Sequence, residues 1–198
     1  MARRSDHSRE ELERMIVIEG YRHMAEVGFA HFSAREVAKR IGYSIGTLYN
    51  VFGSYDRLVF AINTRTFQLW ADDMRARLDG VTHDRIGVLV SGYFAFAQAN
   101  RNVWTAIYDH HMPPDEIVPD AQNAQRGALT DIVVQEIVAV LPRHSNAEAA
   151  RLARSLVATV HGHCTFALNG SFALMGETRP LDLALARVRE ALAAASDG

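Results

Sequence analysis

Cysteine, lysine and long apolar runs are scarce in this sequence, and each scarcity excludes a class of protein. The single cysteine, Cys164, cannot form a disulfide within the chain. No apolar run approaches the ~18 residues that span a bilayer. The first fourteen residues are polar and charged, without the apolar core of a signal peptide. We therefore expect a cytoplasmic protein that makes no membrane contact.

Basic charge is not in excess, because the formal net charge is −2 and Lys39 is the only lysine. Any contact with nucleic acid must therefore come from cations placed locally, such as Arg3 and Arg4 in the N-terminal tail. The sequence also lacks a glycine-rich phosphate loop, paired carboxylates and a nucleophile–base pair at mechanistic spacing. We expect neither an enzyme nor a bound cofactor.

Strand-like alternation is missing as well, whereas helical spacing recurs along the whole chain. The pattern S-x-x-E, typical of a capping box at a helix start, occurs at Ser8–Glu11, Ser33–Glu36 and Ser145–Glu148. Three prolines between residues 112 and 119 predict a loop. The expected helices begin after Ser8 and after Ser33 and cover residues 45–50, 54–78, 83–100, 102–110, 119–141, 147–169 and 180–195. This pattern predicts an all-α fold, with an N-terminal three-helix helix-turn-helix head (1–56) and a larger helical body (57–198).

The short helices around Gly42-Tyr43-Ser44 have the spacing of a helix-turn-helix, in which the second helix enters the major groove. Gly46 would let that helix approach DNA closely, and Ser44 and Thr47 can donate to phosphates or bases. Tyr49 can lie along the sugar-phosphate backbone of the DNA with its hydroxyl on a phosphate. Ile45 can touch a thymine methyl group, or it has no role in recognition; the sequence leaves both open.

Over residues 10–60 the chain resembles the DNA-binding head of the TetR family. The resemblance rests on Gly28-Phe29, Ser33, Val37-Ala38, Gly42, Ser44, Gly46-Thr47-Leu48-Tyr49, Phe52, Ser54 and Leu58. It implies a homodimer that binds double-stranded operator DNA, typically a repressor released by a small-molecule effector. The candidate DNA-binding residues are Arg3, Arg4, Ser33, Ser44, Ile45, Gly46, Thr47, Tyr49, Asn50 and Tyr55.

Two positions depart from the family pattern and keep an alternative open. Tyr55 stands where the family commonly has lysine, and Val51 where it often has histidine or tyrosine. Both positions usually contact phosphate, so fewer contacts would weaken binding and flatten its salt dependence. The alternative is a TetR-like interaction protein that has lost DNA binding.

The body carries looser signals. Residues 103–119 together with His161-Gly162 are similar to a TetR subgroup with a Trp-His-Gly type motif, which names no effector. Aromatic and polar groups at helical spacing could line a small-molecule pocket: Trp70, Met74, Tyr93, Phe94, Trp104, Tyr108, His111 and His161. The candidate dimer interface in the last two long helices consists of Leu156, Val160, Leu168, Leu181, Leu185 and Val188. His161 and Cys164 share a helix face, which leaves a metal-responsive regulator as a further alternative, although we expect no metal site.

Overall fold

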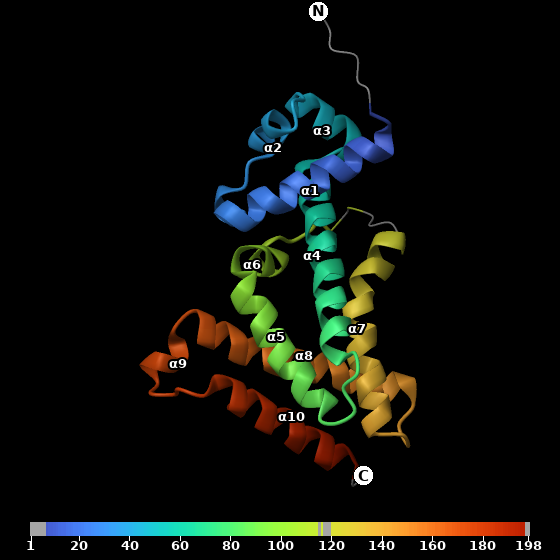
Figure 1. Ribbon diagram of the computed structural model, residues 1–198, viewed down its shortest axis with the longest axis vertical. Helices are drawn as coiled ribbons and strands as arrows, with labels where there is room; N and C mark the ends of the chain where they lie inside the picture. The colour runs from blue at the N-terminus through green and yellow to red at the C-terminus, as the bar shows by residue number, and fades with distance from the viewer. Residues whose placement is uncertain (1–6, 115, 117–119, 197–198) are drawn as a thin grey trace, which may run out of the picture. The chain divides into compact units, whose positions relative to one another are not determined.

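The computed structural model describes residues 7–114, 116 and 120–196. Within these ranges every regular element is helical, so the predicted all-α fold is confirmed (Figure 1). The elements are α1 (Arg9–Val27), the 3₁₀ turn η1 (Phe29–His31), α2 (Ala34–Arg40), α3 (Ile45–Phe52), α4 (Tyr55–Leu78), α5 (Arg85–Ala99), α6 (Arg101–Asp109), α7 (Asp120–Val140), α8 (Asn146–Leu168), α9 (Ser171–Leu174) and α10 (Pro180–Ser196). The sequence analysis missed η1 and α9, which are each shorter than two helical turns.

Serine side chains cap several of these helices, as their spacing predicted. The capping boxes that begin with Ser8 and Ser145 form in both directions. The box predicted at α2 forms in one direction only. Ser33 Oγ accepts from the Glu36 amide at 3.3 Å, but the Glu36 carboxylate pairs with Lys39 and Arg40 instead of reaching back.

The chain divides into two compact units. One, here called the head unit, comprises residues 1–68 and 100–125. The other, the body unit, comprises residues 69–99 and 126–198. Helix α4 contributes to both, with residues 55–68 in the head unit and 69–78 in the body unit. This division differs from the single boundary expected after residue 56, because α6 and the first half of α4 pack with the N-terminal helices.

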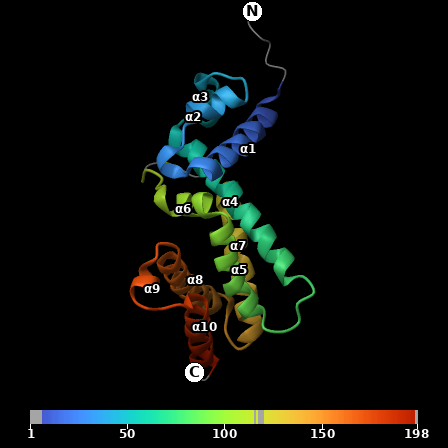
Figure 2. The ribbon, with the colours of Figure 1, turned by 60° about the vertical axis from the view of Figure 1, so that its left-hand side comes forward.

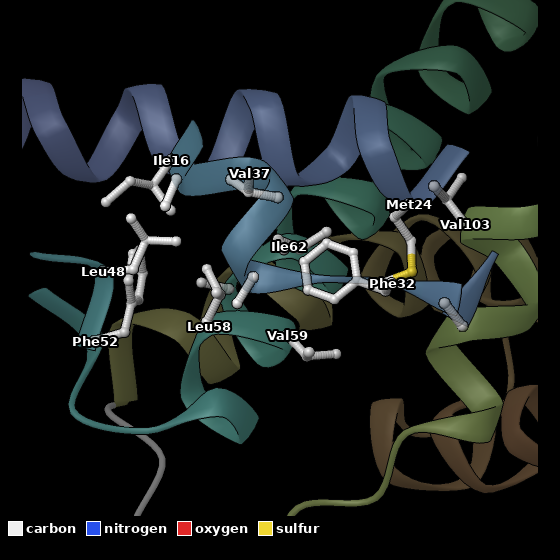
Figure 3. Packing of buried hydrophobic residues seen from close by; sticks show 14 of the residues in the cluster. Ile16, Met24, Phe32, Val37, Leu48, Phe52, Leu58, Val59, Ile62 and Val103 are labelled. Carbon is white, nitrogen blue, oxygen red and sulfur yellow. The ribbon is translucent and has the colours of Figure 1, made fainter. Parts of the chain in front are cut away.

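A continuous apolar core holds the head unit together (Figure 3). Its fully buried members come from helices distant in sequence, including Ile16 on α1, Val37 on α2, Leu48 on α3, Ile62 on α4 and Val103 on α6. Burying each such side chain stabilises the fold by about 1.5–3 kcal/mol. The three N-terminal helices therefore share one core with α4 and α6.

Two asparagine side chains fix α6 within this unit. Asn63, buried on α4, donates from Nδ2 to the carbonyl of Ala106 at 3.1 Å. Asn102 donates from Nδ2 to the carbonyl of Ala25, near the end of α1, at 2.8 Å. The bond from Asn63 gives its buried amide nitrogen an acceptor, and leaving that donor unpaired would be costly.

The body unit is built around α8 and α10, which run antiparallel and are joined through α9 (Figures 1 and 2). Arg85, at the start of α5, fastens its neighbours: Nε and Nη2 donate to the Glu136 carboxylate on α7, each at 2.7 Å. Its Nη1 donates to the carbonyls of Leu78 and Val81 at 2.9 and 2.7 Å. A bidentate guanidinium–carboxylate pair is among the stronger polar contacts in proteins.

Gly20 provides a test of how tightly α1 and α4 pack. A Cβ atom at this position would lie 2.5 Å from Cδ1 of Ile62, which is completely buried and cannot move aside freely. We expect Gly20→Ala to lower the free energy of unfolding by about 1–3 kcal/mol through overpacking. Urea denaturation measures this change. A variant as stable as the wild type would contradict the close approach of the two helices.

Candidate functional site

Helix α3 presents one face to the core and the other to solvent. Leu48 and Phe52 are buried beneath it, as predicted from their spacing. Gly46, Tyr49 and Asn50 are exposed. The residues that a helix-turn-helix would offer to DNA therefore lie on an accessible surface of this chain.

The hydrogen bonds at the start of α3 engage both hydroxyls predicted to meet DNA. Ser44 Oγ accepts from the Thr47 amide at 3.2 Å and so caps the helix. The same Ser44 Oγ lies 3.0 Å from Thr47 Oγ1, in a hydrogen bond in which either hydroxyl can donate. This arrangement satisfies an orphan amide of the first turn and orients both side chains.

Gly46 has no reason within the chain to be glycine. A Cβ atom there would meet nothing closer than Ser44 Oγ at 3.6 Å, an ordinary contact distance. Glycine in a helix costs about 0.5–1 kcal/mol relative to alanine. The space beside this exposed helical glycine is open, so another molecule can approach the backbone of α3 closely at this point.

Arg40, at the end of α2, is held by three carboxylates of the same chain. Arg40 donates Nη2 to Glu26 at 2.8 Å and Nη1 to Glu19 at 3.3 Å. Its Nε lies 3.5 Å from the Glu36 carboxylate. These hydrogen bonds raise the pKa of Arg40, and the one from Arg40 to Glu26 lowers the pKa of that carboxyl. Three of the acids that balance the head's positive charge are thereby drawn around one guanidinium.

Two cations on α2 remain more available. Arg35 is exposed and makes no ion pair within the described part of the chain. The side chain of Lys39 is 78% exposed and reaches Glu36 only at 3.7 Å. Neither residue is among those predicted to bind DNA. The signal was their position on the helix that precedes the recognition helix, the one that crosses the DNA backbone in this motif.

His7 makes a further contact that the sequence did not reveal. Its Nδ1 lies 2.7 Å from the hydroxyl of Tyr43, in the turn before α3. The residues just before α1 are therefore held beside the turn of the helix-turn-helix. The predicted contacts of Arg3 and Arg4 lie outside the described residues.

Ser33 and Tyr55 are both committed to the fold. Ser33 caps α2, which uses its hydroxyl as an acceptor. Tyr55 is partly buried against the head core, with its ring centroid 6.1 Å from that of Phe32. Burial raises the pKa of the Tyr55 phenol, so the hydroxyl stays protonated and able to donate.

The predicted ligand residues fall in different units. Trp70, Met74, Tyr93, Phe94 and His161 belong to the body unit, whereas Trp104, Tyr108 and His111 belong to the head unit. In the head unit, Trp104 is buried, and Tyr108 and His111 are exposed.

In the body unit an aromatic cluster surrounds Tyr93. Trp70 stacks on Phe96 with centroids 4.9 Å apart and meets the edge of Tyr93 at 4.8 Å. The Tyr93 hydroxyl lies 3.0 Å from Nδ1 of His161. Burial lowers the pKa of His161, so the imidazole is neutral at pH 7. The cluster offers an apolar wall with one polar pair.

A small apolar cavity of 50 Å³ adjoins Tyr93 in the body unit. Its other lining residues are aliphatic, such as Leu89, Ile137 and Val160. Of the predicted ligand residues only Tyr93 lines it, so the remainder of the predicted set does not form its wall. This volume accommodates no more than a very small molecule without side-chain movement.

No group of three metal-ligating side chains occurs in the parts of the chain that the structure describes. Burial raises the pKa of the Cys164 thiol to about 12, which disfavours the thiolate that a metal requires.

None of the described helices is long and apolar enough to cross a membrane.

Half of the residues predicted for the dimer interface are buried within the single chain. Leu156, Val160 and Val188 are at most 6% exposed in a single chain, because they form the contact between α8, α10 and their neighbours. Leu168, Leu181 and Leu185 are half-buried. A leucine stripe marks burial without showing which partner supplies it, so a dimer contact through the three half-buried leucines stays a prediction.

The opposite face of α8 is accessible. Ala158 and Gly162 are exposed, and Phe166, four residues further, is 45% exposed. On α10, Leu183 is also exposed. An apolar outer face with small residues at its centre is a surface that another helical layer can cover.

Comparisons with known proteins agree with this architecture. A helix-turn-helix head followed by an all-helical body is an architecture found in DNA-binding transcriptional regulators. Residues 17–62 match the family described as bacterial regulatory proteins, tetR family, and residues 88–192 match the tetracyclin repressor-like C-terminal domain. The chain therefore belongs to the TetR family of bacterial regulatory proteins.

Solved structures share the fold at low sequence identity. A Rhodococcus sp. RHA1 protein of unknown function is 18% identical, with a TM-score of 0.72 and 98% of each chain covered. The multidrug binding protein EbrR, complexed with imidazole, is 19% identical, with a TM-score of 0.62 and coverage of 94% of this chain and 96% of that one. A TetR-like transcriptional regulator from Rhodococcus sp. RHA1 is 17% identical, with a TM-score of 0.56 and coverage of 97% and 99%. No curated protein matches the sequence significantly.

The lowered pKa of His161 makes the stability of the fold pH-dependent. As pH falls through the ordinary histidine value of about 6.5, the unfolded chain takes up a proton before the folded one does, so stability decreases. We expect the free energy of unfolding to fall less between pH 7.5 and 5.5 in His161→Gln than in the wild type. Guanidinium denaturation at both pH values measures this. The exposed His31→Gln serves as the control, and an unchanged pH dependence in His161→Gln would refute the assignment.

Proposed function

We propose that this protein is a homodimeric transcriptional repressor that binds operator DNA through α3 of each copy and is released by a small molecule bound in the body unit. The observation that carries the DNA-binding mode is the open, exposed position of Gly46 on a helix whose other face is anchored in the core. Such a helix can lie deep in a major groove with its backbone close to the DNA.

The cations on α2 support the same orientation. Arg35 and Lys39 are exposed on the helix that would cross the phosphate backbone. Two copies of the motif reach successive half-sites when their recognition helices are about 34 Å apart. Positioning of this kind does not require a strongly basic chain, because the phosphate contacts come from a few local side chains.

The outer face of α8 supports the homodimer. A Cβ atom on Gly162 would find nothing within 4 Å, so this helical glycine also lacks an internal reason. Glycine at such a position lets a second helix approach closely, and Phe166 would lose exposed apolar surface in the contact. A twofold dimer buries the same patch of both chains.

The aromatic cluster around Tyr93 and His161 supports the small-molecule site. One structural relative is described as a multidrug binding protein. Helix α4 runs without interruption from the head unit into the body unit. A ligand that shifts α4 in the body unit would therefore act on the head unit through one continuous helix. To move the protein from 99% to 1% binding-competent, the ligand must prefer the released state by about 10⁴-fold.

The first test measures DNA binding and folding in the same variant. Gly46→Ala should raise the free energy of unfolding by about 0.5–1 kcal/mol, because alanine favours the helix. It should weaken binding to the promoter DNA next to the protein's own gene by about 5- to 150-fold, the cost of about 1–3 kcal/mol for a methyl group forced into a packed contact. Gel-shift titration and urea denaturation give the two quantities.

Gly127→Ala provides the matched control, because Gly127 is a helical glycine on α7 with nothing within 4 Å of its Cβ position. It should gain stability without losing DNA affinity. If Gly46→Ala binds DNA as the wild type does, α3 is not the reading helix. If the wild type shows no preference for its promoter, the chain is the TetR-like interaction protein that has lost DNA binding.

The second test addresses the dimer. Gly162→Leu adds a bulky side chain on the outer face of α8 and should increase the dimer dissociation constant by at least about tenfold. Analytical ultracentrifugation measures it, and circular dichroism confirms that the helices remain. Gly127→Leu serves as the control. A Gly162→Leu protein that dimerises like the wild type would move the interface elsewhere.

A further inference from the structure

Helix α3 carries no charged side chain, since its sequence is IGTLYNVF. We infer that the operator base pairs read by α3 are A·T pairs, with a thymine methyl group against Ile45 and an adenine bound by the amide of Asn50. This inference rests on the proposed function and names the class of DNA sequence that the same surface selects.

Guanine is the base that α3 is least equipped to read. Its O6 and N7 atoms are usually bound by the paired donors of arginine or lysine. Of the nearby arginines, Arg40 is surrounded by three glutamates, and Arg9 lies beside the last turn of α3, where its Nη2 donates to the carbonyl of Val51 at 2.9 Å, away from the first turn of that helix. Arg35 and Lys39 lie on α2, the helix that meets phosphates in this motif.

Ile45 is the first residue of α3, at the end of the helix that enters the groove. Its side chain is partly buried against the head core and partly exposed, so one side of it is fixed. A fixed apolar group at a groove floor is complementary to the thymine C5-methyl group, the one apolar feature that distinguishes base edges there. A cytosine at that position would leave Ile45 without a partner.

Asn50 lies one helical turn beyond Gly46 on the same exposed face. Its amide makes no hydrogen bond within the described part of the chain, so one acceptor and two donors are available. An asparagine amide pairs with adenine N6 and N7 in a bidentate fashion. The glycine beside it allows the backbone to come close enough for this short side chain to reach a base.

The two hydroxyls at the start of the helix add little discrimination. Ser44 Oγ and Thr47 Oγ1 bond to each other, and Ser44 also caps the helix. A hydroxyl contacts any base with a donor or an acceptor, so it accepts more than one sequence. Ile45 and Asn50 are left to specify the base pair.

The experiment starts by selecting duplexes from a random 40-base-pair library with the full-length protein. In the enriched half-site, each thymine is replaced singly by deoxyuridine, which removes only the methyl group. One such replacement should weaken wild-type binding by about fourfold, the value of one buried methyl-sized group. The Ile45→Ala variant should show no response to that replacement. Ile18→Ala, another partly buried isoleucine in the head unit, should respond as the wild type does.

The adenine contact is tested in the same duplex with 7-deazaadenine, which lacks the N7 acceptor. The replacement at one adenine should weaken wild-type binding by about fivefold or more, and Asn50→Ala should be insensitive to it. Asn146→Ala, an exposed asparagine at the start of α8, is the matched control. Because Asn50 is exposed, this arm holds even if Ile45→Ala fails to fold.

The outcomes of this experiment distinguish the reading of A·T pairs from the proposed DNA binding itself. Enrichment of a half-site whose thymine methyl and adenine N7 couple to Ile45 and Asn50 supports the inference. A specific half-site read through guanines, or one insensitive to both replacements, overturns the inference and leaves the repressor intact. No enrichment of any sequence overturns the inference together with the proposed DNA binding.

Discussion

Burial of Leu48 and Phe52 fixes α3, and the exposed face proposed to bind DNA depends on this anchor. Both side chains enter a core assembled from α1, α2, α4 and α6. An eight-residue helix is too short to persist in water by propensity alone, so its geometry comes from tertiary packing. Once these two residues are buried, the 3.6-residue period leaves Gly46 and Asn50 facing outward, and the cap at Ser44 sets where the helix begins.

In the head unit, the pairing of charged side chains decides which cations remain accessible, more than the number of charges does. The Glu19, Glu26 and Glu36 carboxylates gather on Arg40, whereas Arg35 and Lys39 stay accessible on α2. A net charge of −2 is therefore compatible with an anionic partner. In the proposed complex, few phosphate contacts would give a modest non-specific affinity and a shallow salt dependence. In that complex, discrimination between sequences would fall more heavily on the side chains of α3 that are proposed to face the groove.

The glycines of this chain differ in what lies where a Cβ atom would stand. Gly20 is required by Ile62 of the same chain, whereas Gly46 and Gly162 have open space where a Cβ atom would stand. Each of the latter two lies on an exposed helix face. One face belongs to the motif that reads DNA in this family, and the other lies on the outer side of α8. In the body unit, the neutral imidazole of His161 and the hydroxyl of Tyr93 supply the polar pair in an otherwise apolar environment.

Caps, glycines and the helical period are local signals, so the all-α class, nearly every helix boundary, the helix-turn-helix and the inward direction of Leu48 and Phe52 could be predicted from the amino-acid sequence. Which leucines of α8 and α10 are internal, which unit each aromatic residue joins and which arginines are already paired depend on contacts between segments distant in the chain. The one-sided capping box at Ser33 is an example. The Glu36 carboxylate could bond to the amide three residues back or to the cations of its own helix, and in the structure it pairs with the cations. A sequence pattern lists the partners a side chain can have, and packing in three dimensions selects among them.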